Sequence, residues 1–502
     1  MFEAVTAFLA SAIVKKAQSS KNQAVIELHV FPETTRELFK EAMEIFLEHC
    51  LKGNSIVSPL AEPKATVVLN ECIICGDSGQ EKGWPFVIPI PPDLTNPRVL
   101  ALDGAGARAI TQLVVLERLE TLIGLGLPIG WFFDLIVGSS AAVTATAGLD
   151  CQLIANYHVG EEGTKYTDSM MTVWTAAQCT SAAPLYFMPK LEKGIEFRDG
   201  GLKANNPVLL ALDEAKYIWG EVRPDLVLSI GTGKGISPQP QPIGTGIIDY
   251  KLVGLFKTWL NTMNGEEAWE EFCTSEKVNT NMLARCNRLN VDLNGNEPTF
   301  DDIQEIESME LAARAYNKNY TQDSDTPYKP ILGACENPIL EVQAGILRAS
   351  QYFFQITQLS LVLNSQQEKF LIVGTLKCRL GPQETEPFQL LLHMTSYFAV
   401  NGKRDTDMND DLRALKLFEV PLEFTHTTSS GPIRIDVNFG DSYLVAISGF
   451  PMDVQASTNT IQDGVLRDYC ARNGIEETEV AEDSLETIPS TFDAEGEAHL
   501  GG

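Results

Sequence analysis

The sequence has few histidines and few basic residues relative to acidic ones. Among 502 residues there are six histidines, and 38 Lys and Arg residues stand against 67 Asp and Glu residues, a formal net charge of −29. This charge argues against nucleic acid as a partner, because such binding depends on neutralising phosphates with Lys and Arg. It also disfavours electrostatic docking of the whole chain on anionic membranes.

Long apolar runs are also missing. No segment reaches the 18 or so apolar residues of a membrane-spanning helix. The apolar stretch Val5 to Val14 is short and is preceded by Glu3 rather than by basic residues, unlike a signal peptide. Ten cysteines are scattered without a disulfide framework, which is typical of reduced thiols inside the cell. We therefore expect a soluble, cytoplasmic protein.

One local cysteine pair exists, Cys72 and Cys75 in a C-x-x-C arrangement. Without a second pair or a pair of histidines, this is a weak signal for zinc. Two half-buried thiols in a hairpin are the simpler interpretation. We expect no metal.

The chain is too long for one average domain. Changes in pattern predict an N-terminal α+β region over 1–95, an α/β core over 96–240 and a helical extension over 241–335. The Pro-rich run Val87 to Pro92 marks an extended boundary after the first region, because proline does not fit inside a sheet or helix. An acidic tail over 466–502 with almost no aromatic residues is expected to be disordered.

Between them, residues 336–465 are predicted to form a β-rich C-terminal domain. Four apolar runs separated by turn residues are typical of strands there: Phe370 to Gly374, Phe388 to Leu392, Ile433 to Val437 and Tyr443 to Ile447.

The core carries the candidate chemistry. A short apolar strand, Val99 to Leu102, leads through a small-residue turn into an amphipathic helix. A second strand, Phe132 to Val137, ends in Gly138, Ser139 and Ser140. A serine on a tight strand-to-helix turn projects its hydroxyl away from the sheet, so Ser140 is a candidate nucleophile. A packing turn is the alternative, since G-x-S alone is common.

The turn after the first strand contains Gly104, Ala105 and Gly106. Its backbone N–H groups could bind a developing oxyanion, helped by the dipole of the following helix. A dinucleotide site begins in the same way, but the last glycine position is Ala109 and no acidic residue closes a clear second strand. A structural turn is a further alternative. Arg108 could pair with a phosphate or an acidic side chain.

Asp199 follows a predicted strand and precedes Gly200 and Gly201. As a general base it would take the serine proton directly, without a histidine. An ordinary Asp-Gly turn is the alternative. Of the six histidines His158 alone lies in the core stretch, so a Ser-His arrangement is poorly supported.

Together these residues resemble the patatin-like phospholipase family, particularly its multi-domain fungal members. The family pattern is a D-G-G-G-x-R-G turn, a G-x-S-x-G elbow and a D-G-G or D-G-A aspartate. The corresponding segments here are Asp103 to Ala109, Gly138 to Ala142 and Asp199 to Gly201. Thr180 to Pro184 and Leu226 to Gly233 are also similar to the family.

The resemblance implies an α/β fold with a three-layer α/β/α core, and a lipid acyl hydrolase that cleaves glycerolipid or phospholipid esters through an acyl-enzyme without a cofactor. Ser140 would be the nucleophile and Asp199 its base. The oxyanion hole and the supporting positions would be Gly104, Ala105 and Gly106, and Gly138, Arg108, Gly200 and Gly201. A cytoplasmic protein of this kind would contact membranes or lipid droplets peripherally.

Several positions depart from the family pattern. Ala105, Ala109 and Ala142 replace glycines, and Ser140 leads almost directly into Val143 to Thr146, which is similar to a strand that normally lies well downstream. The elbow helix and a lid segment would then be missing and part of the core exposed. The alternatives are therefore a catalytically inactive lipid-binding or interaction protein, or a truncated isoform.

Overall fold

The structure is a computed structural model, and it describes part of the chain. The described ranges are 65–69, 86–90, 95–139, 144–147, 150–154, 173–182, 187–202, 204–219, 223–236, 265–275, 280–298, 302–316, 338–363, 369–381, 384–427, 430–440, 443–452, 475 and 477–481. Ser140, Ala142, His158, Cys72 and Cys75 lie outside them, and so does most of the predicted N-terminal region.

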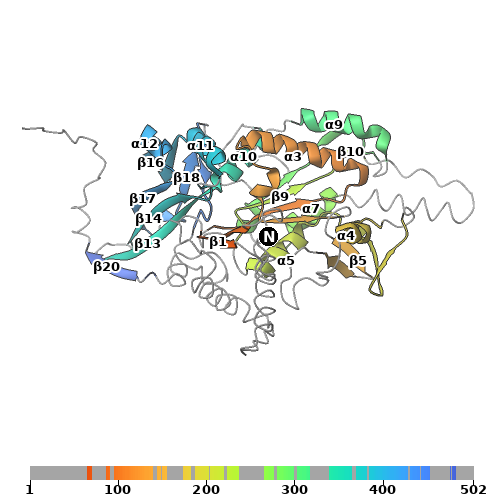
Figure 1. The fold of residues 1–502 in the computed structure, drawn as a ribbon, viewed down its shortest axis with the longest axis horizontal. Coiled ribbons are helices and arrows are strands. Elements are labelled where there is room, and N and C mark those ends of the chain that lie inside the picture. The colour runs from red at the N-terminus through yellow and green to blue at the C-terminus, as the bar shows by residue number, and fades with distance from the viewer. Residues whose placement is uncertain are drawn as a thin grey trace, which may run out of the picture.

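A four-stranded parallel sheet forms the centre of the molecule (Figure 1). Its order is β11-β9-β3-β4, and every neighbouring pair is parallel. The strands are β3 (Arg98–Leu102), β4 (Leu135–Gly138), β9 (Leu226–Ile230) and β11 (Cys286–Leu289). All five residues of β9 are buried, as its continuous apolar run predicts for a parallel strand covered on both faces. The α/β class is confirmed.

Helices cover both faces of this sheet. Because side chains alternate along a strand, Leu100 of β3 packs on the face of α3 (Ala109–Ile123), and Val99 and Ala101 pack on the opposite face. That second face is covered by α5 (Val208–Trp219) and α7 (Gly265–Thr274). The core thus has three layers. On the outer side of α3 lie α9 (Ile306–Ala315) and α10 (Ile339–Ala349), which pack against it.

A small antiparallel sheet lies beside the core, in the order β6-β5-β8-β7. Its strands are β5 (Thr144–Ala147), β6 (Asp150–Leu153), β7 (Lys190–Glu192) and β8 (Ile195–Asp199), and α4 (Val173–Thr180) packs on β8. β5 starts soon after β4 ends, as the sequence predicts for Val143 to Thr146. On β4, Ile136 is 42% exposed.

The C-terminal region is rich in strands, as expected. One four-stranded sheet has the order β17-β14-β13-β20 and another the order β16-β15-β18-β19. Their strands are β13 (Tyr352–Leu363), β14 (Lys369–Cys378), β15 (Tyr397–Val400), β16 (Lys403–Asp407), β17 (Glu419–Thr427), β18 (Ile435–Asn438), β19 (Val445–Ala446) and β20 (Glu477–Ala481). Two helices, α11 (Thr385–Met394) and α12 (Asp410–Arg413), lie between strands in the sequence.

Two predicted elements are wrong. Phe388 to Leu392 lies in α11 rather than in a strand, and Phe388, Leu391 and Leu392 are its buried side chains. That spacing of three and four residues is helical. The Pro-rich run Val87 to Pro92 was expected to lie outside any sheet, yet Phe86–Ile90 forms β2 and pairs with β1 (Ala65–Leu69). Proline is tolerated there because a two-stranded sheet has only edge strands.

The segment expected to be a helical extension also supplies strands. β11 belongs to the central sheet, and β12 (Asp292–Asn296) pairs in parallel with β10 (Lys234–Ile236). The short helix α8 (Thr280–Leu283) precedes β11. The central sheet therefore draws its last strand from beyond residue 240, and the proposed domain boundaries stay a prediction.

Candidate functional site

Three turns predicted to carry the chemistry meet beside the carboxyl ends of β3 and β4. Gly104, after β3, donates its N–H to the carbonyl oxygen of Asn205 at 2.9 Å. Ser139, after β4, donates its N–H to Leu102 O at 3.0 Å. A Cβ on Gly201 would lie 3.1 Å from Asp199 Oδ1, 3.4 Å from Asn205 Oδ1 and 3.9 Å from Ser139 Oγ. The glycine turn, the end of the serine strand and the aspartate turn thus converge.

Asp199 is held firmly at the end of β8. Its side chain is buried, and Oδ1 accepts a hydrogen bond of 2.7 Å from the N–H of Gly201. Its own N–H donates to Ala182 O at 3.1 Å, and Ala145 of β5 lies opposite it in the sheet. Gly200 and Gly201 form a single turn of 3₁₀-helix directly after it. The N–H of Gly201 therefore orients the carboxylate, and the backbone of Asp199 is held by Ala182 and β5.

The oxyanion turn differs from its expected use at one position. The N–H of Gly104 donates a hydrogen bond to Asn205 O, whereas the N–H groups of Ala105 and Gly106 have no partner among the residues that the structure describes. Gly106 is exposed and has φ +53°, a conformation that favours glycine. Ala105 has φ −125°, which any residue adopts, so alanine is unstrained there. Within the described part of the chain, two of the three expected donors thus have no acceptor, and they lie just before the positive end of α3.

Arg108 follows this turn and is buried. Its guanidinium pairs with the carboxylate of Glu297, an acidic side chain of the kind expected. Burial lowers the pKa of Arg108 to about 10, although Asp103 nearby opposes the shift. Gly138 is the last residue of β4.

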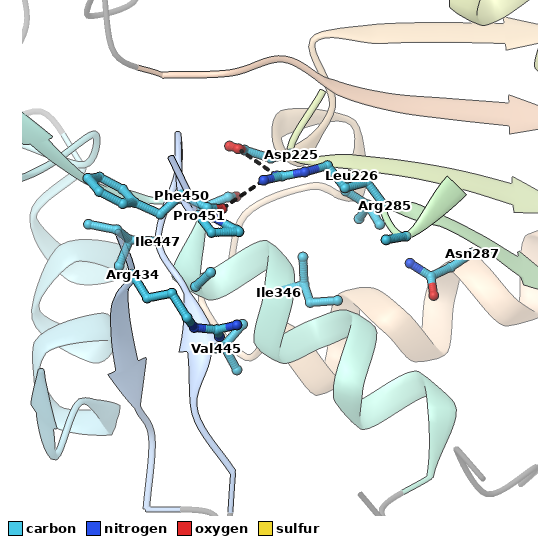
Figure 2. A pocket seen from close by; sticks show the side chains of 13 residues that line it. Asp225, Leu226, Arg285, Asn287, Ile346, Arg434, Val445, Ile447, Phe450 and Pro451 are labelled. Atoms are coloured by element: carbon cyan, nitrogen blue, oxygen red, sulfur yellow. Dashed lines mark hydrogen bonds and ion pairs between the residues drawn. The ribbon is translucent and has the colours of Figure 1, made fainter. Parts of the chain in front are cut away.

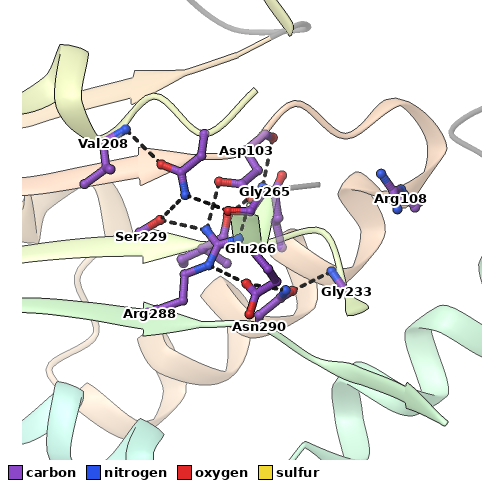
Figure 3. Close-up of polar contacts among 12 residues, drawn as sticks. Asp103, Arg108, Val208, Ser229, Gly233, Gly265, Glu266, Arg288 and Asn290 are labelled. Atoms are coloured by element: carbon purple, nitrogen blue, oxygen red, sulfur yellow. Dashed lines mark hydrogen bonds and ion pairs between the residues drawn. The ribbon is translucent and has the colours of Figure 1, made fainter. Parts of the chain in front are cut away.

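A buried ionic network that was not predicted from the sequence lies beside these turns (Figure 3). Arg288 of β11 reaches Asp103 with two hydrogen bonds, Nη1 to Oδ1 at 2.9 Å and Nη2 to Oδ2 at 2.6 Å. Its Nε donates to Glu266 Oε1 at 2.9 Å. Burial by itself lowers the pKa of Arg288, but the carboxylates of Asp103 and Glu266 outweigh it and raise that pKa above its usual value. Arg288 is therefore a permanent cation.

Amides and a hydroxyl complete the network. Asn290 donates to Glu266 Oε1 at 2.8 Å and accepts the N–H of Gly233 at 2.8 Å. Ser229 Oγ accepts from Arg288 Nη1 at 2.7 Å and from Asn206 Nδ2 at 3.2 Å. These groups lie near the carboxyl ends of β3, β9 and β11. The strand order reverses between β3 and β9, which is where ligands of α/β sheets usually bind.

The structure also contains a small cavity at the opposite end of the central sheet (Figure 2). Asp225 and Arg285, which precede β9 and β11, line it together with Ile346, Phe450 and Pro451. Arg285 Nη2 donates to Phe450 O at 2.9 Å, and its Nη1 lies 3.6 Å from Asp225 Oδ1. This cavity belongs to the seam between the core and the C-terminal strands rather than to the converging turns.

Among the described residues, no group of three or more His, Cys, Asp and Glu side chains is arranged to hold a metal ion. In the same ranges no helix has the length and apolar character needed to cross a membrane.

Comparison with known proteins gives two kinds of match. A domain of unknown function, DUF8392, matches residues 371–462. Phospholipase A I of Arabidopsis thaliana is 38% identical over 61 residues, which are 12% of this chain and 5% of that protein. Calcium-independent phospholipase A2-gamma is 42% identical in Rattus norvegicus and 40% identical in Homo sapiens, each over 62 residues, 12% of this chain and 8% of the relative.

This chain therefore spans less than a tenth of the length of these relatives. Within that short segment, the identities support a relationship to the patatin-like phospholipases that the motifs resemble.

Proposed function

We propose that this protein is a lipid acyl hydrolase that cleaves acyl esters of phospholipids, with Ser140 as nucleophile and Asp199 as base. The observation that carries the proposal is the convergence of the three motif-bearing turns around Gly201. A Cβ on Gly201 would lie 3.1 Å from Asp199 Oδ1 and 3.9 Å from Ser139 Oγ. The relatives with phospholipase names support the substrate class.

In the proposed reaction Asp199 accepts the hydroxyl proton of Ser140 as Oγ attacks the ester carbonyl carbon. The N–H groups of Ala105 and Gly106 bind the oxyanion of the tetrahedral intermediate, which then expels the alcohol with the proton held by Asp199. Water attacks the acyl-enzyme with Asp199 again as base. Asp199 then returns the proton to Ser140 Oγ as the bond to the acyl carbon breaks and the fatty acid is released. No cofactor enters this scheme. We place this chemistry at a membrane surface in the cytoplasm.

Hydrolysis of a soluble short-chain acyl ester tests the proposal. Purified wild type should release the acid, and Ser140→Ala and Asp199→Asn should each lower kcat by about 10⁴-fold. Two matched controls separate catalysis from general damage: Ser139→Ala alters the neighbouring serine, and Asp213→Asn alters an exposed carboxylate on α5. Both controls should retain activity within about tenfold of wild type, since neither supplies the nucleophile or the base.

A folded wild type without activity would contradict the proposal and favour an inactive lipid-binding protein. One observation supports that second function, because the N–H of Gly104, which the resemblance assigns to the oxyanion hole, is already bonded to Asn205. Loss of activity in Ser139→Ala with retention in Ser140→Ala would show that Ser139, rather than Ser140, is the nucleophile.

A further inference from the structure

The hairpin that leads to Asp199 presents apolar side chains to solvent. β7 and β8 are joined by Lys193 and Gly194, with φ values of +47° and +81°. Two central residues with positive φ make the tight turn that matches the twist of a hairpin, so the tip is well defined. β7 is one of the two edge strands of its sheet.

Four large apolar side chains are exposed on this hairpin and its lead-in: Phe187 is 64% exposed, Met188 86%, Leu191 67% and Ile195 38%. We call these four residues the hairpin patch. Single exposed apolar residues are ordinary on a protein surface, but a group this large within nine positions marks an interaction site.

The charges around the hairpin patch differ from those of the whole chain. From Phe187 to Arg198 three cationic side chains stand against two acidic ones, in a chain whose net charge is −29. Arg198 is paired with Glu196 at 2.7 Å, and Lys190 and Lys193 lie on the hairpin beside the exposed apolar residues. The local surface is therefore apolar with a slight positive charge.

This chemistry fits a phospholipid surface better than a second copy of the chain. β7 has only three residues and lysine at its start, and short lysine-bearing edge strands are poor templates for pairing with another strand. At a lipid surface, apolar side chains enter the boundary between headgroups and acyl chains, while lysine amines stay at the headgroups and attract anionic lipids.

We propose that the hairpin patch inserts into the surface of a phospholipid bilayer and holds the protein there, with Lys190 and Lys193 contacting anionic headgroups. The inference rests on the proposed function, in which a phospholipid is the substrate. Ile195 and Asp199 are four residues apart on β8. At about 3.3 Å per residue, this separation is roughly 13 Å. A lipid at the bound surface would thus lie close to the proposed base.

Co-flotation of the full chain with vesicles tests this. Vesicles of phosphatidylcholine, with and without phosphatidylserine, should bind wild type, and the double variant Met188→Ser, Leu191→Ser should lower the partition coefficient by about tenfold or more. The matched control is Ile303→Ser, Leu311→Ser, which removes two side chains that are 72% and 62% exposed on and just before α9. That control should bind like wild type.

Two further variants, Lys190→Gln and Lys193→Gln, test the contribution of the lysine charges to vesicle binding. Each should weaken binding roughly fivefold on vesicles with phosphatidylserine and leave binding to pure phosphatidylcholine unchanged. Unchanged binding of the Met188→Ser, Leu191→Ser variant, or an equal loss in the α9 control, would overturn the inference. Loss of self-association in this variant during sedimentation, with vesicle binding intact, would assign the patch to a second copy and overturn it too.

Ester hydrolysis distinguishes a failure of the proposed hydrolase activity from a failure of the proposed membrane contact. The Met188→Ser, Leu191→Ser variant should hydrolyse the soluble short-chain ester like wild type, because its changes lie outside the proposed catalytic residues. A wild type that binds vesicles through the hairpin but hydrolyses no ester would refute the hydrolase and support the hairpin as a lipid-binding element.

Discussion

Arg288 brings a full positive charge into the interior, and two carboxylates surround it. The side chains of Arg288 and Asp103 are 5% and 2% exposed, and Glu266 is 23% exposed. Their hydrogen bonds link the end of β3 to β11 and to the start of α7. At Gly265, any Cβ would collide with the carboxylate of Asp103, so only glycine fits there. The network fixes the end of β3, which precedes the turn at Gly104, Ala105 and Gly106.

Replacing Arg288 with methionine should therefore be costly. The change leaves Asp103 buried without its cation, and breaking a buried pair in this way typically lowers the free energy of unfolding by about 3–5 kcal/mol. Urea unfolding at neutral pH measures it. Arg314→Met is the control, since Arg314 pairs with Glu117 and Glu310 at the surface and exposed pairs contribute little. Equal stability of both variants would show that the buried network does not support the fold.

Among individual residues, the sequence identified the turns but not their conformations. Three glycines of the family pattern are replaced by alanine, and from the sequence alone each replacement argues against activity. The backbone shows that residues 105 and 109 have ordinary negative φ values, whereas Gly106 needs its positive φ. Nor could the sequence show that Gly104 donates to Asn205, because the two are 101 positions apart.

Among helices and strands, continuous apolar runs were the reliable signal. The runs in β3 and β9 predicted buried parallel strands correctly, because both faces of the sheet are covered. β11 reads Cys-Asn-Arg-Leu and was missed, since its central polar residues are compatible with a buried strand only when partners from distant segments are known. α11 was misread because a five-residue apolar run is too short to separate a period of two from a period of 3.6.

For the whole molecule, the amino ends of the central strands form a seam with the C-terminal region. Arg98 Nε lies 3.0 Å from Asp134 Oδ2, and Arg379 Nη1 lies 3.9 Å from Asp134 Oδ1. On the same side Ser448 and the N–H of Gly449 donate to Asp225. One hydrophobic core runs from the α3 face of the sheet through α10 into the C-terminal strands. The core and the C-terminal strands are therefore expected to unfold together.

The ion pairs of Asp134 in this seam should make the free energy of unfolding depend on pH. Burial by itself raises the pKa of Asp134, but the guanidinium groups of Arg98 and Arg379 outweigh it and hold that pKa below its usual value. The folded pKa is lower than the unfolded one, so the stabilisation is complete above an unfolded pKa of about 3.9 and is lost as pH falls through the folded pKa. Urea unfolding of wild type and Asp134→Asn should show a difference in stability that shrinks below about pH 4. A difference independent of pH would contradict this account.

Covalent labelling tests whether Ser140 is a nucleophile assisted by Asp199, as proposed above. When an alkyl fluorophosphonate reacts with an activated serine, a bond forms between phosphorus and the serine Oγ. Fluoride leaves phosphorus, and the serine hydroxyl loses its proton. We expect one adduct on wild type by intact mass, and peptide analysis should map it to Ser140. Labelling should be absent in Ser140→Ala and strongly slowed in Asp199→Asn. Ser139→Ala should label like wild type. A folded wild type that remains unlabelled, or an adduct that persists in Ser140→Ala, would contradict the claim.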